Sequence, residues 1–189
     1  MKKTLTVQKL ALIGLMAALV FATSGMRIYI PLPLDKAALP FGNVMCVLSG
    51  LLLGPIGGLA SGIGSFFYDL TNPLYAAEAL VTFFNKFFIG FVAGLISHWG
   101  GRRGRSLGWN IAGAVAGSVT YVVLYLTKSY LASQLIFDLT SGSEMMLYLV
   151  PKGVLSLTNG IIACVVAVPL AKALRVALDR NGLSEKFGI

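Results

Sequence analysis

Apolar residues gather in six stretches along the chain, at residues 8–26, 41–54, 56–70, 77–97, 108–127 and 145–170. A transmembrane helix needs about 20 mainly apolar residues, which four of these stretches supply. The two stretches between residues 41 and 70 are shorter, at roughly 14 residues each. The pattern predicts an all-α integral membrane protein, in which residues 1–189 form a single domain of six transmembrane helices.

The interruptions between these stretches have their own sequence signals. Gly54-Pro55 divides the second stretch from the third, and more glycines follow at positions 57, 58, 62 and 64. Short segments interrupted by glycine and proline favour tight hairpins and often lie near the substrate in transporters. Between the first two stretches, Pro31, Pro33 and the charge pair of Asp35 and Lys36 break helical periodicity. They predict an extended outer loop that is able to act as a lid.

Charge separates into two sets when the stretches are threaded alternately through a bilayer. One set holds the N-terminus, the turn near Gly54, the loop 98–105 and the C-terminal tail, and it accounts for the whole net charge of +8. Its members are Lys2, Lys3, Lys9, Arg102, Arg103, Arg105, Lys172, Arg175, Arg180 and Lys186, with Asp179 and Glu185. The other set is balanced and comprises Arg27, Lys36, Lys86, Lys128 and Lys152, with Asp35, Asp69, Glu78, Asp138 and Glu144. Because basic loops mark the cytoplasmic side, we expect both termini to be cytoplasmic.

Composition excludes a soluble protein, because 57% hydrophobic and 12% charged residues leave too little polar surface. Lys2 and Lys3 resemble the start of a signal peptide, but the long apolar run without a cleavage site before Arg27 favours a retained helix. The basic residues lack interleaved aromatics, so we expect anionic lipid headgroups, and no nucleic acid, as their counter-charge.

Chemistry-bearing motifs are sparse. No GxxxxGK[ST] motif is present, so ATP hydrolysis would have to come from another subunit. His98 is the single histidine and is expected in a loop, while Cys46 and Cys164 sit in apolar stretches as packing residues. We therefore expect no metal, no cofactor and no enzymatic activity.

Polar residues at membrane depth are the candidates for ligand binding, because a charge at a helix centre costs about 2.5–3.5 kcal/mol. Lys86 is the clearest one, and three interpretations stay open: pairing with Asp69 or Glu78, contact with a ligand, or snorkelling to the surface. The substrate-binding residues predicted along one outward-facing cavity are Asp69, Asn72, Tyr75, Glu78, Asn85, Lys86, Tyr121, Tyr125, Lys128, Tyr148, Lys152 and Asn159. Tyr125 and Tyr148 also suit an interfacial aromatic belt.

Small residues line one face of the first stretch, at Ala11, Gly14, Ala18 and Ala22. Such a face permits close helix approach in lipid. It serves either packing within this protein or docking of a partner membrane protein.

The order of these features resembles the substrate-binding S component of energy-coupling factor (ECF) vitamin transporters. The resemblance rests on the small-residue first helix, Ile30-Pro-Leu-Pro33, Phe41-Gly-Asn43, Leu51-Leu-Leu-Gly-Pro-Ile-Gly-Gly58 and Asn85-Lys-Phe-Phe-Ile-Gly90 followed by Ala93-Gly94. It implies a multi-pass protein of a prokaryotic plasma membrane that captures a vitamin at its outer face. The partners implied are a transmembrane coupling subunit, docked on Gly14, Ala18 and Ala22, and two cytoplasmic ATPases, with release by toppling in the membrane.

The ligand and the transport class stay open at this point. Lys86, Lys128 and Lys152 suit a carboxylate such as that of pantothenate, whereas the tyrosines suit a pyridoxine-like or pyrimidine-like ring. The alternative functions are a self-contained small secondary transporter or channel, and a membrane assembly factor that binds no small molecule.

Overall fold

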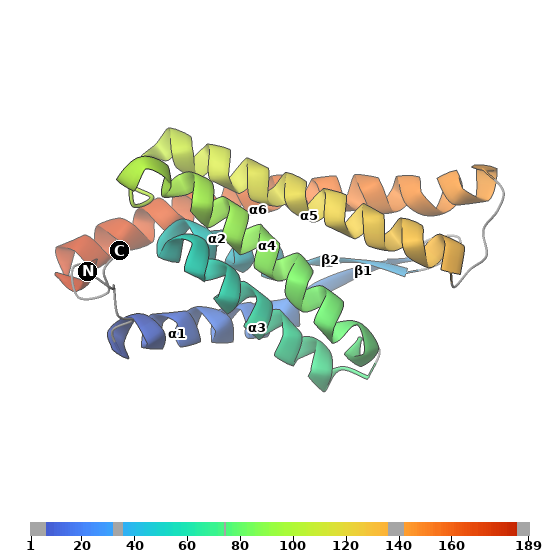
Figure 1. Cartoon of the computed structure of the whole chain (residues 1–189), viewed down its shortest axis with the longest axis horizontal. Helices are drawn as coiled ribbons and strands as arrows, with labels where there is room; N and C mark the ends of the chain where they lie inside the picture. The colour runs from blue at the N-terminus through green and yellow to red at the C-terminus, as the bar shows by residue number, and fades with distance from the viewer. Residues whose placement is uncertain (1–6, 32–35, 74, 136–141, 185–189) are drawn as a thin grey trace.

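The computed structural model describes residues 7–31, 36–73, 75–135 and 142–184, with the side chains of residues 28–40 left out. It contains six α-helices in chain order: α1 (Val7–Ser24), α2 (Gly42–Leu53), α3 (Gly57–Thr71), α4 (Ala79–Ser97), α5 (Leu107–Leu135) and α6 (Gly142–Arg180). Short 3₁₀ turns η1 (Gly54–Ile56), η2 (Ala76–Glu78) and η3 (Trp99–Gly101) link them. Each helix packs against at least two others (Figure 1). The expected all-helical membrane fold is confirmed.

The predicted extended loop after the first helix is in fact a β-hairpin. Strand β1 (Arg27–Pro31) pairs antiparallel with β2 (Lys36–Pro40), with Arg27 opposite Pro40 and Pro31 opposite Lys36. The prolines predict extended backbone in this segment. They do not indicate that its two halves pair, because pairing depends on the register between strands. Pro33 and Asp35 lie outside the described residues, and β2 packs on α6.

Helices α2 and α3 fold back on each other at Gly54, which confirms the predicted turn. Gly54 has a φ of 74°, a left-handed conformation that glycine adopts without a Cβ clash. Ser49 Oγ lies 2.7 Å from Ser61 Oγ, and the hydroxyl of Ser61 donates to the Cys46 carbonyl at 3.2 Å. Because the serines bond across the hairpin, their polar groups are satisfied inside an apolar bundle.

Glycines allow α4 to approach α2 and α3 closely. A Cβ on Gly50 would lie 2.3 Å from the Gly90 carbonyl oxygen, and one on Gly94 would lie 2.2 Å from that of Gly54. On the next face of α4, the rings of Phe83 and Phe87 stack at 6.1 Å, over α3. The glycine density in the sequence therefore marks backbone contact between helices, as expected for membrane proteins.

Five segments of the described residues are long and apolar enough to cross a membrane, and one of them, Gly42–Thr71, contains both α2 and α3. These two helices have 12 and 15 residues, about 18 and 22 Å, against a hydrocarbon core of about 30 Å. The count of six spans thus stays a prediction. In contrast, α5 and α6 extend well beyond the predicted 108–127 and 145–170, because a helix continues into the polar region where hydropathy no longer marks it.

The described basic residues of the set with the net charge gather at one end of the molecule. The start of α1, the α4–α5 turn and the end of α6 all lie there (Figure 1), and Arg105 pairs with Asp179 at 3.3 Å. The geometry agrees with the predicted separation of charge, while the assignment of that end to the cytoplasm stays a prediction. Lys2, Lys3, Asp138, Glu185 and Lys186 lie outside the described residues.

Candidate functional site

The predicted binding residues occur in the half of the bundle away from the chain termini. There α2 begins, α3 ends, α4 begins and the β-hairpin approaches α6 (Figure 1). Their contacts form four small groups. That these groups line one shared cavity stays a prediction.

The central group joins α2, α4 and α5. Lys86 Nζ donates a hydrogen bond to Asn43 Oδ1 and lies 5.0 Å from the centroid of the Tyr121 ring. The Tyr121 and Tyr125 rings stack with centroids 5.6 Å apart. Asn43, Lys86 and Tyr121 are all buried. The group combines a cationic donor, an amide and two stacked rings, which suits a planar ligand with carbonyl acceptors.

Neither Asp69 nor Glu78 neutralises the charge of Lys86, although one interpretation of the sequence paired them. Asp69 pairs with Arg27 at 2.9 Å, and Glu78 pairs with Lys128. Lys86 therefore donates to an amide. Among the described residues, no carboxylate lies within salt-bridge distance of its ammonium group. The interpretation that Lys86 forms an ion pair with Asp69 or Glu78 is therefore wrong.

The second group fixes the start of the β-hairpin against α3. Besides the ion pair to Asp69, Arg27 donates from Nε to the Ser24 carbonyl at 2.7 Å. Its guanidinium lies 4.7 Å from the Tyr68 ring centroid and 4.5 Å from that of Tyr75. The arginine is held between two aromatic faces, an arrangement in which cation–π attraction adds to the ion pair. Asp69 and Tyr75 thus contact Arg27.

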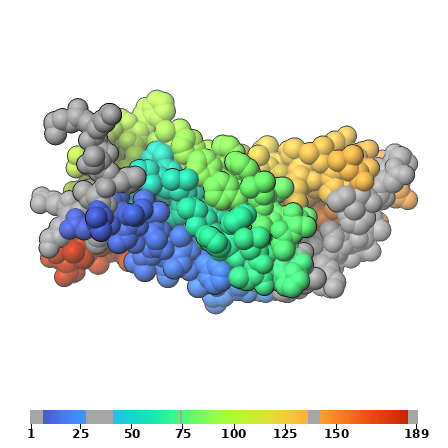
Figure 2. Space-filling model, turned by 60° about the horizontal axis from the view of Figure 1, so that its bottom comes forward, coloured from blue at the N-terminus to red at the C-terminus, as the bar shows by residue number. Residues whose placement is uncertain are grey.

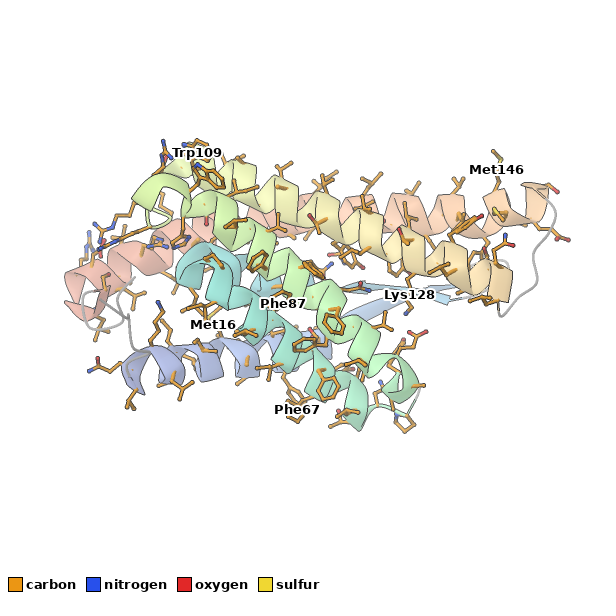
Figure 3. The ribbon with its side chains drawn as sticks, viewed as in Figure 1. Met16, Phe67, Phe87, Trp109, Lys128 and Met146 are labelled. Carbon is orange, nitrogen blue, oxygen red and sulfur yellow. The ribbon has the colours of Figure 1, made fainter. Side chains whose placement is uncertain are left out.

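The third and fourth groups lie near the end of α5 and near the start of α6. Lys128, labelled in Figure 3, extends from α5 and pairs with Glu78, which closes the η2 turn onto α5. On α6, Lys152 Nζ lies 3.8 Å from the Tyr148 ring centroid, and both residues are buried. Asn159 is buried two turns further along α6, while Asn72 caps the end of α3 and Asn85 lies half-buried on α4.

Sequence reasoning missed two residues of these groups. The sequence predicts no contact for Arg27, and it gives Asn43 no role beyond the Phe41-Gly-Asn43 motif. Asn43 carries the signal that identified Lys86, a polar side chain near the start of an apolar helix. Arg27 carries none, because its partner is 42 residues away in sequence.

The predicted docking residues lie on the outer face of α1. Gly14, Ala18 and Ala22 are exposed, and a Cβ on Gly14 would meet nothing within 4 Å. Packing inside the protein uses the opposite face, where Ile13, Met16 and Val20 are buried. Figure 2 shows α1 on the surface beside α3. Internal packing does not use these three residues. Their exposed face is therefore available for docking of a partner.

Three similarities to known proteins bear on this arrangement. The family model for the ECF-type riboflavin transporter, S component, matches residues 4–176. A solved structure of the S component of a bacterial ECF transporter covers 90% of this chain and 96% of its own, with a TM-score of 0.60 and 20% identity, which supports the fold. An uncharacterised protein of Pyrococcus woesei is 34% identical over 98 residues, which are 51% of this chain and 65% of that protein, less than two thirds of its length.

The family model extends from the small-residue helix α1 through the polar groups of α3 to α6, and it therefore covers both the predicted docking face and the predicted binding residues. S components are substrate-binding subunits, and catalysis is not their role. The chain belongs to the ECF-type riboflavin transporter S component family.

Proposed function

We propose that this protein captures riboflavin, or a close flavin relative, at the outer face of a prokaryotic plasma membrane. It would then deliver the ligand through a transmembrane coupling subunit and two cytoplasmic ATPases. The observation that carries the proposal is the match of the riboflavin S component model over residues 4–176. The polar and aromatic groups in one half of the bundle give it chemical support.

Riboflavin has a flat tricyclic ring with carbonyl and ring-nitrogen acceptors, a hydroxylated chain and no net charge near neutral pH. Lys86 and Asn43 supply donors beside the stacked rings of Tyr121 and Tyr125. Aromatic faces favour a planar ring, and buried donors favour its carbonyl groups. The ion pair of Lys128 with Glu78 leaves less charge for a ligand carboxylate than the sequence indicated. The stacked rings favour a flavin, while the uncompensated charge of Lys86 also suits a carboxylate, so pantothenate is the main competitor to test.

The sequence cues named pantothenate, a pyridoxine-like ring and a pyrimidine-like ring, and riboflavin was not among them. The ligand panel should therefore include all four. We would purify the full chain alone in detergent, follow its melting temperature with each vitamin, and measure affinity by calorimetry. Co-purified riboflavin would also be visible by its absorbance.

Riboflavin is expected to raise the melting temperature and to bind with sub-micromolar affinity, as a capture subunit requires. A strong response to pantothenate with none to riboflavin would overturn the flavin assignment and leave the capture role intact. Silence across the panel from well-folded protein would count against capture of these vitamins.

A self-contained secondary transporter or channel is the second candidate. It predicts riboflavin uptake into liposomes that contain this protein alone, whereas a capture subunit gives binding without net uptake. Liposomes with and without the coupling subunit and ATPases distinguish the two.

A further inference from the structure

An uncompensated arginine pair lies where the chain enters α5. Arg102 and Arg103 are both exposed in the turn between η3 and α5. Arg105, the third arginine of the turn, pairs with Asp179. Among the residues that the structure describes, neither Arg102 nor Arg103 has a carboxylate within salt-bridge distance. Two positive charges therefore face outward from the turn.

The guanidinium of Arg102 is held in place by uncharged groups. Its Nη1 atom donates to the Trp99 carbonyl at 2.9 Å, and its central carbon lies 4.4 Å from the Trp109 ring centroid. Stacking fixes the plane of the guanidinium and leaves other N–H groups available, which is the geometry in which arginine binds phosphate. The contact orders the side chain without neutralising it.

Exposed tryptophans in this turn favour a position at the level of lipid headgroups. Trp99 is 60% exposed and Trp109, labelled in Figure 3, is 37% exposed. Indole rings concentrate at membrane–water interfaces because one edge is polar and the rest apolar. An arginine stacked on such a ring is therefore held next to the phosphate layer.

An apolar stripe on α5 begins at the same turn. Its members are exposed and recur every four residues, at Leu107, Ile111, Val115, Val119 and Val123. Residues four apart lie on one side of a helix, with a slow drift around it. Gly108 shares this side with Val115 and Val119, and a Cβ added to Gly108 would meet nothing within 4 Å. The turn that carries the arginines thus leads directly into a surface suited to hydrocarbon.

We propose that the turn at residues 99–109 binds the headgroup of an anionic phospholipid. Arg102 and Arg103 bind its phosphate, and its acyl chains lie on the α5 stripe from Leu107 to Val123. A free phosphate ion would match the arginines but would leave the stripe unused, so charge and apolar surface together favour a lipid. The site lies at the end opposite the candidate vitamin site, and its test needs no vitamin.

The test is native mass spectrometry of the full chain in detergent, titrated with phosphatidylglycerol or phosphatidylcholine. Phosphatidylglycerol should stay bound at concentrations where phosphatidylcholine does not. The double variant Arg102→Gln, Arg103→Gln should bind it roughly 25-fold more weakly, since each basic residue near an anionic surface contributes a factor of about five. The double variant Lys172→Gln, Arg180→Gln, at exposed basic residues of α6 outside the turn, is the charge-matched control and should bind as wild type does.

Gly108→Glu gives an independent variant in case loss of the arginines disturbs folding. It places a carboxylate on the exposed side of α5 where the lipid would lie, and should weaken phosphatidylglycerol binding by like-charge repulsion. Unchanged binding in either folded variant would overturn the proposal. Binding of inorganic phosphate as strong as that of phosphatidylglycerol would indicate a free-anion site and would also overturn the proposal. Variants that lose assembly with the coupling subunit but bind lipid unchanged would indicate a protein-docking site instead.

Discussion

Lys86 on α4 donates a hydrogen bond to Asn43 on α2, and the two side chains are 8% and 2% exposed. A lysine so deep in an apolar bundle needs a polar partner, because desolvation of its charge is costly. The amide satisfies one of its three N–H donors and leaves the charge uncompensated at short range. The pair therefore provides both a link between helices and a donor for a ligand.

Replacing Lys86 with glutamine separates these two roles. The glutamine amide can still donate to Asn43, so the protein should stay folded and its melting temperature should change little. Riboflavin binding should weaken roughly tenfold, because the binding site loses a charged hydrogen-bond donor to the ligand. Calorimetry on the purified variant measures this, with Lys172→Gln as the control. Wild-type affinity in a folded Lys86→Gln protein would remove Lys86 from the site.

The Arg27–Asp69 pair should contribute to stability more than to ligand binding. Its side chains are 12% and 3% exposed, and removing one charge leaves the other buried. Asp69→Asn should therefore destabilise the protein by roughly 3 kcal/mol. The control is Glu78→Gln, which breaks the more exposed pair with Lys128 and should cost under about 1 kcal/mol. Chemical unfolding in detergent micelles measures both, and equal losses would contradict the assignment.

Helix existence could be predicted from the sequence because apolar runs of about 20 residues have few other stable outcomes in a bilayer. Helix ends could not, since α6 continues to Arg180, well past its apolar part. The turn at Gly54 was predictable because glycine and proline act locally. The hairpin after α1 was not, because pairing of Arg27 with Pro40 depends on contacts remote in sequence.

For the site, polarity at membrane depth located individual residues but not their partners. The energetic cost of a charge in lipid identified Lys86, and pairing with an acid was one of three interpretations that stayed open for it. The acids are satisfied by Arg27 and Lys128, which approach from a β-hairpin and from α5. Which groups share a contact is a property of helix packing, and hydropathy does not encode it.

Close contact between α2 and α4 predicts a sharp difference between two glycines. Gly50→Ala would place a methyl group 2.3 Å from the Gly90 carbonyl oxygen, so the helices must separate. We expect a loss of roughly 1–3 kcal/mol in unfolding free energy. Gly14→Ala meets nothing within 4 Å and should be neutral or stabilising by roughly 0.5–1 kcal/mol. Melting temperatures in one detergent compare the two, and an equal effect would argue against the packing.

His98 predicts a pH dependence at the basic end of the molecule. Burial, reinforced by the positive charge of Arg175, lowers the pKa of His98 from 6.5 to about 4. The unfolded chain therefore takes up a proton between pH 6.5 and 4 that the folded chain does not, and stability should fall as pH drops through this window. His98→Gln should reduce that fall. Melting temperatures between pH 7.5 and 4.5 test this, and identical profiles would contradict it.

The outer face of α1 predicts a separation of binding from transport. Ala18 and Ala22 are exposed and take no part in packing inside the protein, so Ala18→Leu with Ala22→Leu should leave folding and riboflavin binding unchanged. Leucines would keep a partner helix from approaching closely, and uptake with the coupling subunit and ATPases should be abolished. Leu10→Ala, at an exposed residue of the same helix on the flank of that face, is the control and should transport normally. Normal uptake by the double leucine variant would show that the coupling subunit docks elsewhere, since two added side chains on its path cannot leave a close helix contact intact.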